Sequence, residues 1–343
     1  MPEAWESERA ALLGRRISDL GLRLQGTRVQ QLVDQLYAEL RARGLVFLPP
    51  VYLTNEWGCP SGTPVIGVPF YLADRDLMRL EEEVAAAVET EEESMRYLRH
   101  EAGHAYNYAY RLYDRPEWRR IFGPYSRPYR DRYHADPFSR NFVRHILAWY
   151  AQKHPDEDFA ETFAVWLTPG LDWRTRYRNW PVLHKLEYVE RTMQEIGSEP
   201  PVVSAQITDD DLPVDAMHYT VEQHYRELEQ RLPLDDERFF DGDLLTIFTM
   251  GDQDGGEAPP AARFLSEHRR ELVARIGYWT GEGPGIVGAF IDLLVRRAEE
   301  LGLYARMREA STLIELTAFG TAVMMNYRYT DTLGRVEPEE EAP

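Results

Sequence analysis

The sequence predicts an α+β protein that is mostly helical and carries one small sheet at its edge. Apolar residues recur at helical spacing through most of the chain, on both sides of residues 46–73. Within residues 46–73 the pattern changes to two β-rich runs interrupted by Pro and Gly. The 343 residues are 43% hydrophobic and 12% aromatic, which is enough for one large domain or two of ordinary size.

The composition argues against several kinds of partner. A formal net charge of -19 makes nucleic acid and an anionic membrane surface unfavourable partners. The single cysteine, Cys59, excludes an intrachain disulfide, and the first residues lack the apolar core of a signal peptide. No uninterrupted apolar run reaches the roughly 18 residues of a membrane span. We therefore expect a soluble, cytoplasmic protein.

Residues 4–44 are predicted to form two helices on either side of a glycine-containing segment, residues 21–26. In the second helix Thr27 can cap the N-terminus, and Gly44 ends the helix. Its apolar residues form one stripe, which indicates packing and implies no chemistry.

The two β-rich runs, residues 46–53 and 65–73, predict a hairpin with a long loop. Pro49, Pro50 and Pro69 cannot donate ladder hydrogen bonds, so we expect these runs at the edge of a sheet. A peptide could add to such an edge through main-chain hydrogen bonds. The hairpin could equally be purely structural.

Residues 74–89 and 90–110 are predicted to form two successive helices. Thr90 and Glu93 match the capping box at the start of the second, and acidic residues occupy its first turn, where the helix dipole favours them. Apolar residues at helical spacing give this helix a buried face.

The helix over residues 90–110 carries the pattern HExxH. His100 and His104 lie four residues apart on one face, with Cβ atoms about 5–6 Å apart. Both imidazoles can therefore bind one zinc ion at Zn–N distances of about 2.0–2.1 Å. Glu101 would lie beside the metal and act as general base toward the attacking water. The alternative is a pair of core histidines that flank a surface glutamate.

A catalytic zinc needs a third protein ligand. One class of HExxH enzymes uses a third histidine six residues after the second, but Tyr110 stands there. The other large class takes a glutamate from a later helix and often adds an acidic residue four positions on. Glu157 and Glu161 match that arrangement, as the ligand and as the residue that holds a ligand histidine.

The alternative for these acidic residues is ordinary charge at a helix N-terminus. It explains residues 156–158 well, but it does not explain Glu161 beside an apolar face. His154 and Asp158 remain weaker candidates for the third ligand.

Between the two helices with candidate ligands, residues 123–141 are dense in Arg, Tyr and Pro. This segment is basic in an acidic protein. It could face a substrate, or it could be a tyrosine-rich connector packed on the surface.

The C-terminal part reads as helices separated by loops. A further helical region over residues 174–197 ends at the sequence GSEPP, which indicates a domain boundary. We therefore expect one domain over residues 1–199, a helical C-terminal domain without an assigned role over residues 200–335, and an acidic tail over residues 336–343.

Three separated motifs resemble, in order, a bacterial family of zinc-binding metallopeptidases over roughly residues 15–197. They are NEWGCPSGTPVIGVPFYLADRDLMRLE, LRHEAGHA and AWYAQKHPDEDFAETFAVWL. The resemblance implies a zincin-like metallopeptidase domain of the gluzincin type with Zn2+ as its cofactor. More distantly, the helix with Glu157 is similar to that of the anthrax lethal factor and Pro-Pro endopeptidase group. In that group a tyrosine seven residues before the glutamate ligand stabilises the transition state, which implies this role for Tyr150. The alternative is a tyrosine that merely packs in the protein interior.

Together these observations predict a zinc-dependent peptidase that acts on a protein or peptide, with Glu101 as general base. A zinc-stabilised binding or scaffold protein is an alternative, although a purely structural zinc site has no use for Glu101. A hydrolase of a non-peptide amide is a further alternative.

Overall fold

The computed structural model describes residues 2–85, 88–130, 133–208, 211–228, 236–251, 258–305 and 308–333. It is mostly helical, with 61% helix and 5% strand, which confirms the predicted fold class. The chain forms two compact units. The first unit comprises residues 1–81 and 88–224, and the second comprises residues 82–87 and 225–343.

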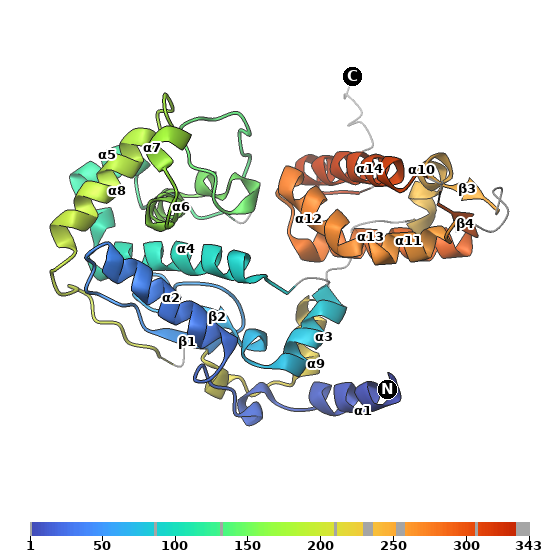
Figure 1. Cartoon of the computed structure of the whole chain (residues 1–343), viewed down its shortest axis with the longest axis horizontal. Coiled ribbons are helices and arrows are strands. Elements are labelled where there is room, and N and C mark those ends of the chain that lie inside the picture. The colour runs from blue at the N-terminus through green and yellow to red at the C-terminus, as the bar shows by residue number, and fades with distance from the viewer. Residues whose placement is uncertain are drawn as a thin grey trace, which may run out of the picture. The chain divides into compact units, whose positions relative to one another are not determined.

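In chain order, the elements that start in the first unit are α1 (Pro2–Leu13), η1 (Ile17–Leu20), α2 (Arg28–Ala42), β1 (Val51–Thr54), β2 (Ile66–Pro69), η2 (Phe70–Ala73), α3 (Arg75–Ala85), α4 (Glu91–Ala109), η3 (Leu112–Asp114), α5 (Pro116–Phe122), η4 (Leu147–Gln152), α6 (Pro155–Leu167), α7 (Trp173–Arg176), α8 (Leu183–Ile196), η6 (Val214–Ala216) and α9 (Val221–Leu228). Figure 1 shows α4 running between α2 with the two strands on one side and α6 with α8 on the other. α4 is therefore the central helix of this unit.

The N-terminus of α4 forms as its sequence predicts. The Thr90 hydroxyl accepts a hydrogen bond from the Glu93 N–H at 3.2 Å, and the Glu93 carboxylate accepts one from the Thr90 N–H at 2.9 Å. The predicted capping box is thus confirmed. It fixes where the helix begins, and so which side chains of α4 turn toward the interior.

α4 packs most extensively against α6, and one glycine allows their close approach. A Cβ atom on Gly103 would lie 2.7 Å from the Ala160 Cα. Every residue of α6 is buried, including the acidic residues of its first turn. Solvated charge at a helix N-terminus therefore does not explain residues 156–158.

The two strands pair in parallel, with Val51 opposite Ile66 and Thr54 opposite Pro69. The predicted hairpin, which requires antiparallel strands, is therefore wrong. The connection over residues 55–65 carries the chain back to the start of β1, where Ile66 pairs with Val51. It also brings Gly58 to the opposite edge of β2, where the Gly67 N–H donates to the Gly58 carbonyl at 2.7 Å.

The described residues of 200–224 belong to the first unit, and the N–H groups of Val202 and Val203 both donate to the Ala109 carbonyl. The domain division after residue 199 stays a prediction, and the acidic tail over residues 336–343 lies outside the described residues.

The elements of the second unit are η7 (Glu237–Phe240), α10 (Asp241–Ile247), β3 (Thr249–Met250), α11 (Ala261–Glu267), α12 (Arg269–Thr280), α13 (Pro284–Glu300), β4 (Leu303–Tyr304) and α14 (Glu309–Thr330). Its helices pack around an apolar core that includes Ile276, Phe290 and Leu294. β3 and β4 pair in antiparallel fashion. In the described part of the chain, no helix is both long enough and apolar enough to cross a membrane.

Candidate metal centre

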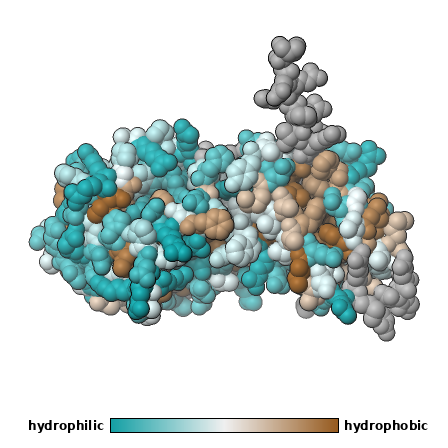
Figure 2. All heavy atoms as spheres, turned by 90° about the horizontal axis from the view of Figure 1, so that it is seen from above, coloured by the Kyte–Doolittle hydropathy of each residue, from teal (hydrophilic) through white to brown (hydrophobic). Residues whose placement is uncertain are grey.

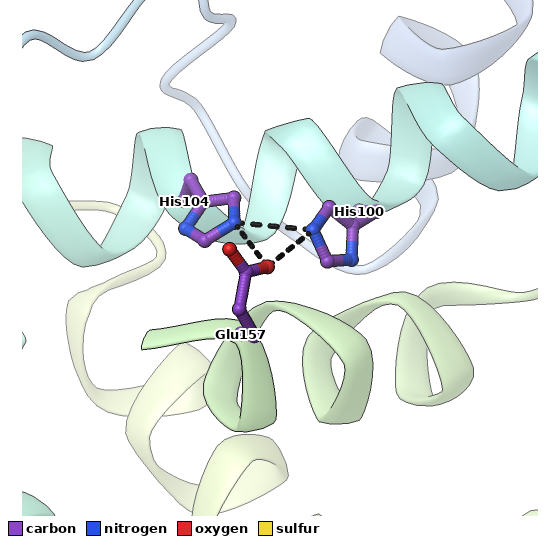
Figure 3. A group of neighbouring side chains, drawn as sticks. All are labelled: His100, His104 and Glu157. Atoms are coloured by element: carbon purple, nitrogen blue, oxygen red, sulfur yellow. Dashed lines mark hydrogen bonds and ion pairs between the residues drawn. The ribbon is translucent and has the colours of Figure 1, made fainter. Parts of the chain in front are cut away.

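Three of the predicted site residues come together between α4 and α6. The His100 Nε2 and His104 Nε2 atoms lie 3.0 and 3.1 Å from the Glu157 Oε2 atom, and 3.1 Å from each other. Figure 3 shows the two imidazoles pointing from α4 toward the Glu157 carboxylate of α6. All three side chains are buried. Among the described residues they form a group that could hold a metal ion.

The spacing of these three atoms fits zinc. Tetrahedral zinc with bonds of about 2.0–2.1 Å holds its ligand atoms about 3.3–3.4 Å apart. The observed triangle is only slightly smaller than this. Two imidazoles and one carboxylate are also the ligand set of catalytic zinc sites that keep a fourth position open.

The Nδ1 atoms of both histidines lie close to carboxylate oxygens. The His100 Nδ1 atom lies 2.8 Å from the Glu161 Oε1 atom, and the other oxygen of Glu161 accepts a hydrogen bond from the Ile146 N–H at 2.8 Å. The His104 Nδ1 atom lies 3.2 Å from the Asp156 Oδ2 atom, although the angle is not that of a hydrogen bond. Such carboxylates orient metal-binding histidines and raise their basicity.

The electrostatics of the site reflect this ring of carboxylates. Burial disfavours the charged imidazolium, but the hydrogen bonds to Glu157 and Glu161 raise the pKa of His100 to about 9. The pKa of His104 is also raised well above its usual value, because the charges of Asp156 and Glu157 outweigh burial. The metal-free site thus favours bound protons, and a metal ion must displace them.

Glu101 faces the same cavity as the metal-binding group. Burial raises the pKa of its carboxyl, and the neighbouring imidazoles of His100 and His104 oppose that shift. The cavity has a volume of about 450 Å³, and its lining includes Glu101 and the three side chains of the metal-binding group. A carboxylate with a raised pKa at this place is suited to receive a proton during a reaction.

Tyr150 also lines the cavity, with its ring centroid 5.6 Å from that of His100. The two residues before it, Ala148 and Trp149, have positive φ values of 70° and 53°. Such backbone conformations are unfavourable for residues other than glycine, and they cluster at functional sites. This irregular turn sets the direction in which Tyr150 enters the cavity.

The two weaker ligand candidates lie outside the metal-binding group. The Asp158 carboxylate accepts a hydrogen bond from the Lys185 Nζ atom at 2.6 Å. The Nδ1 atom of His154 accepts from the Asp156 N–H at 3.1 Å, so His154 caps α6, while its Nε2 atom donates to the Arg127 carbonyl at 2.8 Å. His154 therefore lines the cavity without joining the group.

The contacts of two residues, Asp156 and Tyr129, were not foreseen from the sequence. Asp156 faces His104, and it also accepts hydrogen bonds from Asn107 and Tyr108 at 2.6 and 2.5 Å. The Tyr129 hydroxyl donates to the Glu157 Oε1 atom at 2.6 Å. The contacts of Asp156 could have been suspected from its place in the first turn of the helix that carries Glu157.

Tyr129 belongs to the basic, tyrosine-rich segment over residues 123–141. Tyr125, Arg127 and Tyr129 of this segment line the cavity. The sequence left two interpretations open, a substrate-facing segment and a surface connector. The second does not describe the whole segment, because part of it borders the candidate metal centre.

Comparison with known proteins agrees with this site. Residues 72–175 match the model of a family described as "Putative zinc-binding metallo-peptidase". No curated protein and no solved structure gives a significant match to the chain. The segment that contains His100, His104 and Glu157 is thus similar to a family of zinc-binding metallo-peptidases, and zinc is the metal that these ligands fit.

Proposed function

We propose that this chain is a zinc-dependent peptidase that hydrolyses peptide bonds of a protein or peptide in the cytoplasm. The observation that carries the proposal is the placement of Glu101 on the cavity that the His100–His104–Glu157 group also lines. A structural zinc site needs no titratable side chain beside its ligands. The intact carboxylate therefore favours a hydrolase over a zinc-stabilised scaffold.

Zinc on the three ligands would supply a Lewis acid and lower the pKa of bound water toward about 7. Glu101 takes one proton from the water molecule as the water oxygen attacks the carbonyl carbon of the substrate. Glu101 then delivers this proton to the amine nitrogen as the C–N bond breaks. The Tyr150 hydroxyl donates a hydrogen bond to the oxyanion that develops on the carbonyl oxygen.

The residues around the ligands have a supporting role in this proposal. Glu161 and Asp156 orient the rings of His100 and His104 through their Nδ1 sides. Their negative charge also increases the electron donation of the imidazoles toward a metal ion. The distant resemblance to the lethal factor group supports the role of Tyr150.

The decisive experiment compares Glu101→Gln with the wild-type protein on a peptide library, with zinc content measured in parallel. The variant should retain one zinc ion per chain and lose about 10²–10⁴-fold in turnover, because it keeps the side-chain shape but removes the proton acceptor. Tyr37→Phe, which alters a hydroxyl bonded to the Pro49 carbonyl, provides a control that should cleave normally.

Each other outcome decides against part of the proposal. Equal cleavage by Glu101→Gln and wild type would refute the assigned base. Zinc binding without any Glu101-dependent cleavage of peptides would favour the scaffold, and cleavage of a non-peptide amide alone would favour the other hydrolase.

A further inference from the structure

The two oxygens of the Glu157 carboxylate have different surroundings. The Oε2 atom lies 3.0 and 3.1 Å from the Nε2 atoms of His100 and His104. The Oε1 atom accepts a hydrogen bond from the Tyr129 hydroxyl at 2.6 Å. One oxygen is thus directed to the place of the metal, and the other is held by a phenol.

This difference matters because a carboxylate can bind a metal through one oxygen or through both. A short hydrogen bond to the Oε1 atom of Glu157 stabilises binding through Oε2 alone. Binding through both oxygens would fill a coordination position that a catalytic zinc keeps open for water or substrate. A group that holds Oε1 therefore protects that position.

The two residues just before α6, Lys153 and His154, contact Tyr129 and its neighbouring backbone. The Lys153 Nζ atom lies 4.3 Å from the centroid of the Tyr129 ring and 5.2 Å from that of Tyr150. The hydrogen bond from His154 to the Arg127 carbonyl ties the backbone near Tyr129 to the start of the same helix. Tyr129 and Glu157 are thus anchored to the same end of α6.

The Tyr129 hydroxyl also lies 3.3 Å from the Tyr150 hydroxyl. Since Tyr129 gives its hydrogen to Glu157, Tyr150 is the donor in this contact, and Tyr129 holds the Tyr150 hydroxyl beside the metal-binding group until an oxyanion takes over that hydrogen bond. A shift of Tyr129 would change the positions of both.

We propose that Tyr129 is a positioning residue of the metal centre, which holds Glu157 as a ligand through one oxygen and aligns the Tyr150 hydroxyl. This inference rests on the zinc site of the proposed function, but it does not require that the substrate be a peptide. The residue lies outside the helices with HExxH and Glu157, in the segment over residues 123–141.

The test is Tyr129→Phe, which keeps the ring and removes only the hydroxyl. Zinc affinity is measured by competition with a chromogenic chelator, and the visible absorption of the Co2+-substituted protein reports the coordination number. We expect zinc binding to weaken about 10–100-fold, as for other residues that orient metal ligands. We also expect the Co2+ spectrum to change from a four-coordinate toward a five-coordinate form.

The matched control is Tyr37→Phe, since it also removes a hydroxyl that donates a 2.6 Å hydrogen bond, there to the Pro49 carbonyl. It should leave zinc affinity and the Co2+ spectrum unchanged. Wild-type affinity and spectrum in Tyr129→Phe would overturn the inference and leave the zinc site intact. An equal loss in both variants would also overturn it, because the effect would then be general destabilisation. A wild-type protein that binds no zinc would instead refute the proposed function itself.

Discussion

A helix pair in each unit crosses at a glycine, and the two crossings differ in what the glycine meets. In the first unit a Cβ on Gly103 of α4 would lie 2.7 Å from the Ala160 Cα of α6. In the second unit a Cβ on Gly320 of α14 would lie 2.4 Å from the Ile276 Cδ1 of α12. The first neighbour is main chain and cannot move without the helix, whereas the second is the end of a flexible side chain.

The interiors around the two crossings differ as well. Charged side chains such as Glu101, Glu157 and Glu161 are buried beside the α4–α6 crossing. In the described part of the second unit, the buried polar or charged side chains are Thr280, Arg297 and Thr312. The face in Figure 2 is mostly hydrophilic over the first unit and has hydrophobic patches over the second.

The two crossings show that close helix packing and buried charge carry different information. Burial of charge is unfavourable unless it is paired or bound to a metal, so a protein retains it where it is used. Close packing at a glycine occurs in both units and indicates no function by itself. In the first unit, several of the buried charged side chains lie at the candidate metal centre.

The largest effect on stability is expected for Lys185→Met. Lys185 is the buried partner of Asp158, with 2.6 Å between the Nζ and Oδ2 atoms. The variant leaves the carboxyl without its cation, at a cost of about 3–5 kcal/mol in the free energy of unfolding, measured by urea denaturation. Arg297→Met, which breaks the pair with the more exposed Asp241 of the second unit, should cost less. Equal losses would remove the contrast between the units.

Zinc should stabilise the first unit alone. At a free zinc concentration about a thousand times the Kd, bound metal adds about 4 kcal/mol to the stability of the folded site. Hydrogen exchange should therefore slow in α4 and α6 and stay unchanged in α12 and α14. His104→Ala should abolish this protection, and protection that persists in that variant would place the metal elsewhere.

Acid should destabilise the first unit between about pH 6.5 and 4. Burial lowers the pKa values of His145 and His224 to about 4. The unfolded chain, with ordinary histidine pKa values of about 6.5, binds more protons than the folded chain in this window, so stability falls as pH falls. Each histidine contributes on the order of 3 kcal/mol at the acid end. Denaturation curves of His145→Gln across this range should show a smaller pH slope, and an unchanged slope would exclude His145 as a cause.

Gly103→Ala should weaken both folding and zinc binding. The added methyl group overlaps the Ala160 backbone, so α4 and α6 must separate, at a cost of about 1–3 kcal/mol. Because Glu157 moves with α6, the zinc affinity measured by chelator competition should fall as well. Normal zinc affinity in a destabilised variant would show that the crossing does not control the site.

The smallest effect is expected for Gly320→Ala. The Ile276 side chain can move away from the new methyl group, and replacing glycine inside a helix gains about 0.5–1 kcal/mol. The two terms nearly cancel, so the thermal midpoint should change little. A loss as large as that of Gly103→Ala would mean that the two crossings are equally rigid.

Local features of the sequence predicted most of the helices and the two histidines of the site. The start of α4 depends on Thr90 and Glu93, which are three residues apart. His100 and His104 lie on the same face of the helix because they are one helical turn apart. Glu157 could be proposed because zinc needs a third ligand of this type. The roles of Glu101, Tyr150 and Glu161 stay predictions, although all three lie close to the metal-binding group.

What the sequence did not predict depends on contacts between distant segments. The direction of β2 is set by the path of residues 55–65, and proline positions carry no information about it. The contact between Tyr129 and Glu157 depends on irregular backbone over residues 123–130. The turn at Ala148 and Trp149 requires positive φ values, which neither residue type suggests.

The separation of the ligands along the chain determines when the metal can bind during folding. Glu157 follows His104 by 53 residues and reaches it only when α6 docks on α4. Contacts between residues so far apart form late, because a long loop must close first. In a zinc finger the ligands are close in sequence and the metal drives folding. Here we expect the site to be complete only after α4 and α6 have assembled. We therefore expect newly made chains to fold first and to bind zinc afterwards.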